Sequence, residues 1–81
     1  LKGDEQRANI LLGLALLLNN HHKQAIERFE LSQDIMEEYF VIMRHYGLAM
    51  AHWKLGSLAL AEKHIEECVN RSKNTLNHTS S

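Results

Sequence analysis

The sequence predicts an all-α domain made of two stacked helix-turn-helix repeats, with four antiparallel helices. Three observations indicate this fold class. Apolar residues recur at three- and four-residue steps over four segments. The chain has no proline, and turn-forming residues gather only near residues 19–22, 37–38 and 56–57. A shift of 36 residues superposes small residues on small ones and bulky residues on bulky ones, as a stacked repeat requires.

The first two helices are expected over about residues 4–18 and 22–36. Asp4 opens the first helix with a carboxylate, which suits the positive end of a helix dipole. Asn19 or Asn20 is the expected N-cap of the second helix. The second helix directs one face inward, made of Ala25, Ile26, Phe29, Ile35 and Met36.

The other two helices are expected over about residues 38–55 and 57–73. Ser57 is a favourable N-cap for the last helix. Residues 74–81 are polar and show no helical pattern, so we expect a disordered tail. The folded domain is then residues 1–73, with repeat one at about 6–37 and repeat two at about 40–73.

The aligned positions identify the kind of repeat that the chain resembles. Leu12, Gly13 and Leu16 stand where the tetratricopeptide repeat has its L-G-x₂-Y, and Ala25 and Phe29 match its A-x₃-F. The second repeat offers Leu48, Ala49, His52, Ala61 and Ile65 at the same places. The step from the small residue of the first helix to the alanine of the second is the same in both repeats. The resemblance spans about residues 6–73 and implies an α-α superhelix.

Some positions depart from that family's pattern. Asn9 and His45 replace its tryptophan, and Glu37 and Lys73 stand where its proline would be. The period is 36 residues rather than about 34. Each repeat is nevertheless expected to close on itself along a seam of Leu12, Leu16, Ala25, Phe29, Leu48, Ala61 and Ile65.

The resemblance implies a protein–protein interaction module whose first helices line a concave face. The side chains expected on that face are Ile10, Leu14, Leu17, Met43, Tyr46, Met50 and Trp53. Methionine and aromatic side chains suit an adaptable seat for a partner helix or peptide. Alternatively, a second copy of the chain or further repeats of a longer array cover this face. The lysine, asparagine and arginine with which some members clamp acidic C-termini are missing, so we expect no such clamp.

No constellation of residues predicts catalysis, a cofactor or a metal site. His64 and Cys68 lie one helical turn apart and His45 and His52 two turns apart, but no C-x₂-C or H-E-x-x-H motif occurs. Cys68 stands beside two glutamates, whereas a reactive thiol needs an electropositive setting. We expect structural histidines, a cysteine that packs as a small apolar residue, and no enzyme activity.

Composition restricts the partners and the compartment. The formal net charge is −1 with the histidines neutral, so nucleic acid is not an expected partner. The longest apolar run, residues 10–18, is too short to cross a membrane. The single cysteine fits a reducing, cytoplasmic compartment. We expect a protein or peptide partner, or a homo-oligomer. The rival interpretation is a ligand- or peptide-sensing regulatory domain of a larger protein, such as a transcriptional regulator.

Overall fold

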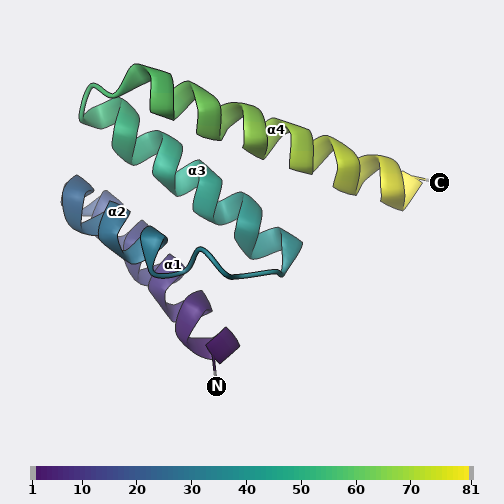
Figure 1. Ribbon diagram of the computed structural model, residues 1–81, viewed down its shortest axis with the longest axis horizontal. Coiled ribbons are helices and arrows are strands. Elements are labelled where there is room, and N and C mark those ends of the chain that lie inside the picture. The colour runs from purple at the N-terminus through teal and green to yellow at the C-terminus, as the bar shows by residue number, and fades with distance from the viewer. Residues whose placement is uncertain (1, 81) are drawn as a thin grey trace.

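The computed structural model describes the backbone of residues 2–80 and the side chains of residues 3–75. Four helices follow one another: α1 (Lys2–Leu18), α2 (His22–Glu30), α3 (Glu38–Lys54) and α4 (Leu58–Ser80). The first two form one helical hairpin and the last two form another, and α3 lies between α4 and the first hairpin (Figure 1). The described residues contain no strand, so the predicted all-α fold with two helix-turn-helix repeats is confirmed.

The tight turns inside the two hairpins have the same backbone structure. Asn20 has φ 64° and Gly56 has φ 85°, and these two left-handed residues are 36 positions apart. In the first turn His21 N–H donates to the Leu16 carbonyl, and in the second Ser57 N–H donates to the His52 carbonyl. A second bond, from the left-handed residue itself to Leu17 or Trp53, completes the same helix-ending motif in each repeat. The repeat seen in the sequence is therefore a repeat of backbone geometry.

Asn20 thus ends α1 and does not cap α2, which corrects the sequence-based prediction. The residue before α2 is His21, whose side chain makes no capping hydrogen bond. Asn19 turns back and donates from its side chain to the Ala15 carbonyl at 2.9 Å. Asparagine tolerates the left-handed conformation better than most residues, so the turn uses it for that purpose.

A side-chain pair also recurs at equivalent positions of the two hairpins. Arg28 of α2 donates to Asn9 of α1 at 3.3 Å. The residues 36 positions later are His64 of α4 and His45 of α3, whose Nδ1 atoms lie 3.0 Å apart. Each hairpin is therefore closed by a polar pair between its first and second helices, with different chemistry in each repeat.

Phe29 lies at the centre of the core and joins the two repeats. Its side chain is fully buried. A Cβ atom built on Gly13 of α1 would lie 2.6 Å from the Phe29 ring, and one built on Gly47 of α3 would lie 2.3 Å from it. Carbon atoms in contact are about 3.5–4.0 Å apart, so only glycine leaves room for the ring at either position. The two glycines let three helices approach around one aromatic side chain.

The buried seam differs from the prediction at two positions. Ala25, Phe29, Leu48 and Ala61 are buried as expected, and Leu16 packs against the core cluster. Leu12 is 42% exposed and Ile65 is 51% exposed, so neither belongs to the core. Residues outside the predicted seam complete the buried cluster, namely Ile10, Ile35 and Val41. Within the part of the chain that the structure describes, α4 packs on no helix other than α3, which is why Ile65 remains exposed although its equivalent, Phe29, is covered by α3.

Helix α2 ends at Glu30, six residues before the predicted end at Met36. The Phe29 carbonyl accepts hydrogen bonds from the Ser32 hydroxyl at 2.8 Å and from Arg44 Nε at 2.7 Å. The same carbonyl also accepts a hydrogen bond from the Ser32 backbone N–H at 3.1 Å, so three donors gather where the helix ends. The chain then turns over residues 31–34 and leaves Met36 90% exposed, which corrects its predicted inward position.

Helix α4 is longer than predicted. The sequence pattern ends it near Lys73 and predicts a disordered tail, whereas the helix continues to Ser80. Arg71 holds the middle of α4 against the start of α3 through Glu38, at 3.1 Å. Over the described part of the chain, no helix is long and apolar enough to cross a membrane.

Candidate partner-binding groove

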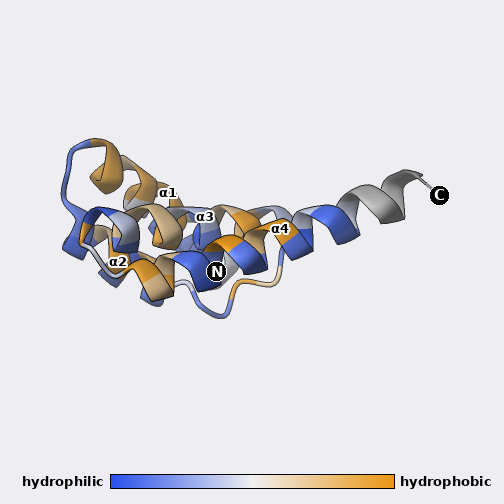
Figure 2. Cartoon of the chain, turned by 90° about the horizontal axis from the view of Figure 1, so that it is seen from above, coloured by the Kyte–Doolittle hydropathy of each residue, from blue (hydrophilic) through white to orange (hydrophobic). Residues whose placement is uncertain are grey.

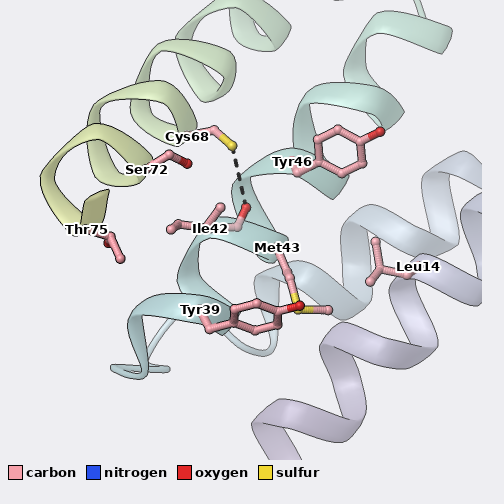
Figure 3. A pocket seen from close by; sticks show the side chains of 8 residues that line it. All are labelled: Leu14, Tyr39, Ile42, Met43, Tyr46, Cys68, Ser72 and Thr75. Carbon is pink, nitrogen blue, oxygen red and sulfur yellow. Dashed lines mark hydrogen bonds between the residues drawn. The ribbon is translucent and has the colours of Figure 1, made fainter. Parts of the chain in front are cut away.

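An apolar groove of about 510 Å³ lies between α1, α3 and α4 (Figure 3). Helix α3 forms its floor, and Leu14 of α1 and the C-terminal half of α4 form its two sides. Its lining consists of Leu14, Tyr39, Ile42, Met43, Tyr46, Cys68, Ser72 and Thr75. Helices α3 and α4 supply all of this lining except Leu14, and Figure 2 shows hydrophobic colour on each of the helices that border the groove. The groove offers a partner mostly carbon surface, with hydroxyl groups at its α4 side.

Three of the seven residues predicted for the concave face line this groove: Leu14, Met43 and Tyr46. Leu14 and Met43 are half-buried and pack on the core, and Tyr46 is exposed. They come from two helices that are adjacent in space, as the repeat alignment requires. These three residues remain our candidates for contact with a partner.

The other four predicted residues lie elsewhere. Ile10 has no exposed surface because α3 packs against α1, so it is a core residue that no partner can contact. Leu17 is half-buried against the core. Met50 and Trp53 are exposed on α3 but do not line the groove. Helical spacing predicts that these residues lie on one face of α1 and one face of α3, but it does not show where a neighbouring helix covers that face.

Sequence reasoning missed the side of the groove that α4 provides. Cys68, Ser72 and Thr75 line it from one helix face. Their spacing of four and three residues is the helical pattern that could have identified this face. A helix predicted to end at Lys73 does not reach Thr75, so the row was not recognised. The Cys68 thiol points toward the Ile42 carbonyl, 3.9 Å away, and packs as a small residue between α4 and α3.

Charged residues fix the angle at which α4 crosses α3. Arg71 donates from Nε to Glu67 at 2.8 Å and from Nη1 to Glu38 at 3.1 Å. Glu38 is the first residue of α3, so this pair joins the N-terminal end of α3 to the middle of α4. Exposed ion pairs of this kind contribute about 0–1 kcal/mol, so their role is mainly to set geometry.

Three histidines gather on the seam between α3 and α4. The His45 and His64 rings lie 5.2 Å apart between centroids, and His52 stacks on His64 at 5.8 Å with an interplanar angle of 4°. Burial lowers the pKa of His45 and of His64 below the ordinary value of 6.5, and nearby Arg44 lowers both further. With both rings neutral, one Nδ1 donates the hydrogen bond and the other accepts it.

This histidine cluster does not have the geometry of a metal centre. Within the described part of the chain, no three histidine, cysteine or acidic side chains converge as metal ligands. His52 and His64 are stacked with their ring planes parallel, rather than directing ring nitrogens toward a common point. The arrangement instead makes the seam sensitive to protonation.

The arrangement of the helices defines a class of protein. Two helical hairpins related by a 36-residue shift, stacked through a shared aromatic residue, form an α-helical repeat protein.

The comparison with known families specifies which repeat this is. Residues 44–75, which run from α3 into α4, match the family model of the tetratricopeptide repeat. The matched segment is the second of the two repeats, so this part of the chain is similar to the tetratricopeptide repeat. No curated protein and no solved structure matches the chain. Repeats of this family generally mediate protein–protein interaction and are generally not enzymes.

Proposed function

We propose that this chain is a protein–protein interaction module that binds an apolar helix or peptide in the groove between α1, α3 and α4. The observation that carries the proposal is the apolar lining of a groove of about 510 Å³. The groove is open along α3, and exposed Tyr39 and Tyr46 stand at its surface. A methionine and two tyrosines in one groove give adaptable contact area together with hydroxyl groups for orientation.

The partner class follows from the chemistry of the lining. Among the described residues no charged side chain lines the groove, so an acidic or basic peptide gains no ion pair there. An amphipathic helix that presents apolar residues at i, i+3, i+4 and i+7 fits such a groove best. Association with a second copy of the chain is a separate part of the proposed function and does not require the groove.

Selection from a library of displayed peptides tests the groove. Peptides enriched on the parent should carry helically spaced apolar residues and should lose binding to Tyr46→Glu. Tyr46 is 57% exposed, so the charge enters the groove without opening the core. Met36→Glu is the matched control, since Met36 is an apolar side chain that is 90% exposed and does not line the groove.

The single cysteine provides a second measurement. Cys68 lines the groove, so a bound peptide should slow its alkylation by a maleimide. Peptides that bind the parent and Tyr46→Glu with equal affinity, and leave the alkylation rate unchanged, would place the binding site elsewhere.

A further inference from the structure

The repeat symmetry of the chain leaves one apolar surface at each end of the molecule. At the α4 end, Met50, Trp53 and Ile65 are between 36% and 55% exposed. Their equivalents 36 positions earlier are Leu14, Leu17 and Phe29, of which Phe29 is fully buried and the two leucines are half-buried. The same positions are thus packed in repeat one and open in repeat two. We name the three exposed residues the end surface.

The structure shows what kind of element packs on these positions. In repeat one they lie under or beside α3, which packs on both α1 and α2. Helix α3 uses Arg44, Gly47 and Ala51 for this contact: Arg44 donates to the Phe29 carbonyl, Gly47 touches the Phe29 ring, and Ala51 is fully buried. Gly47 and Ala51 show that these positions accept a helix with small residues at three- and four-residue steps, and in repeat one Arg44 adds a hydrogen bond to this packing.

Such a helix is present at the other end of the same chain. The equivalents of Arg44, Gly47 and Ala51 are Ala8, Leu11 and Ala15 of α1, and all three are exposed. Leu18 continues the stripe and is 86% exposed. We name Ala8, Leu11, Ala15 and Leu18 the start surface. Isolated exposed leucines are ordinary, but this stripe repeats the spacing of the α3 packing stripe, with Ala8 in place of Arg44 and therefore without its hydrogen bond.

We propose that copies of this chain associate head to tail, with α1 of one copy packed on α3 and α4 of the next as α3 packs on α1 and α2. The sizes of the facing side chains compensate each other. Within the chain Gly47 faces the large Phe29 ring, whereas between copies the larger Leu11 would face the smaller Ile65. This proposal rests on the proposed function in one respect, that the chain is an interaction module. It does not require a ligand in the groove, because the start surface and the end surface lie outside it.

The path of α4 favours a second copy over a helix joined to α4 by a short loop. In repeat one, the chain turns after Glu30 and residues 31–37 lead into α3. The equivalent residues 67–73 are helical, and α4 runs straight through them to Ser80. The short connection that brings a covering helix onto repeat one is therefore absent at that place in repeat two, and this difference favours a second copy as the cover.

A mixing experiment tests the proposed contact. A head-to-tail contact does not close on itself, so the mass of the parent measured by light scattering should rise with concentration beyond that of a dimer. Leu11→Glu blocks the start surface and Ile65→Glu blocks the end surface, so each variant alone should stay at the monomer mass of 9.3 kDa. An equimolar mixture of the two keeps one intact pair of surfaces and should form a dimer and nothing larger.

Controls separate this association from misfolding and from groove binding. Leu18→Lys and Trp53→Glu block the same two surfaces at different residues and should behave in the same way, with helical circular dichroism equal to that of the parent. Tyr46→Glu, which removes binding in the groove, and Met36→Glu should assemble as the parent does. A parent that stays monomeric at millimolar concentration overturns the proposal. So does a mixture of blocked variants that stays monomeric, which would instead indicate a symmetric contact.

Discussion

Replacing Gly47 by alanine tests whether Phe29 couples the two repeats. The new Cβ would lie 2.3 Å from Phe29 Cζ and 2.8 Å from Cε2. Carbon atoms need about 3.5–4.0 Å, so the ring would have to retreat by more than about 1 Å. It cannot do so freely, because the backbone at Gly13 is also close to the ring and the side chain is fully buried.

Two opposing effects set the magnitude. Overpacking a well-packed core costs about 1–3 kcal/mol. Alanine in place of a mid-helix glycine contributes about 0.5–1 kcal/mol in the other direction. We therefore expect a net loss of up to about 2 kcal/mol, and each kilocalorie lowers the melting temperature of a domain this size by about 4–8 °C.

The assay is thermal unfolding followed by circular dichroism, with Gly3→Ala as the matched control. Gly3 also lies in a helix, but a Cβ placed on it would meet only the Arg7 side chain at 3.5 Å, an ordinary contact. That variant should melt at or slightly above the parent. Combining Gly47→Ala with Phe29→Leu should reduce the cost of the alanine, because the smaller side chain frees space. A Gly47→Ala protein that melts above the parent would show that helix propensity dominates and that the ring is not confined.

Three further predictions concern the core and the histidines. Phe29→Ala should lower the free energy of unfolding by about 3–5 kcal/mol. Small domains have little more stability than this, so much of the protein should be unfolded at room temperature. A melting curve like that of the parent would contradict the packing described above. The pKa of His45 and of His64 is lowered in the folded chain, so the unfolded chain takes up protons first. The free energy of unfolding should therefore be highest above about pH 6.5 and should fall as the pH drops below that value. In thermal melts between about pH 7 and about pH 5, His64→Gln should make the melting temperature depend less on pH. Zinc or a chelator should leave the melting temperature unchanged, and a chelator-induced loss of helix would reveal a metal site instead.

The fold was largely predictable because its signals are local. Helical spacing located four helices, and the 36-residue shift located their pairing. The shift also aligned Asn20 with Gly56, which share a left-handed backbone, although the sequence pattern favoured Asn20 as a cap for the following helix. Either interpretation fits an asparagine between two helices, and only the backbone angle decides between them.

The candidate site was less predictable because burial depends on which helices become neighbours. Ile10 and Tyr46 occupy equivalent positions, yet one is in the core and the other is exposed. The difference arises from α3, which packs against the first hairpin but has no counterpart beyond α4 in the described part of the chain. Periodicity reports the face of a helix on which a residue lies, but it does not report what covers that face. The end of α4 was misjudged for a related reason, since no apolar stripe marks residues 74–80.

The four helices are not equally tethered. Among the described residues α4 packs on α3 and on no other helix, whereas the cluster around Phe29 draws together α1, α2 and α3. Proteins open locally with free energies that range from near zero up to that of global unfolding. Helix α4 is the element that can detach while the other three stay folded, so its amide protons should exchange with solvent first. A molecule seated on the end surface would oppose that opening, and its binding would be measurable as slower amide exchange along the whole of α4.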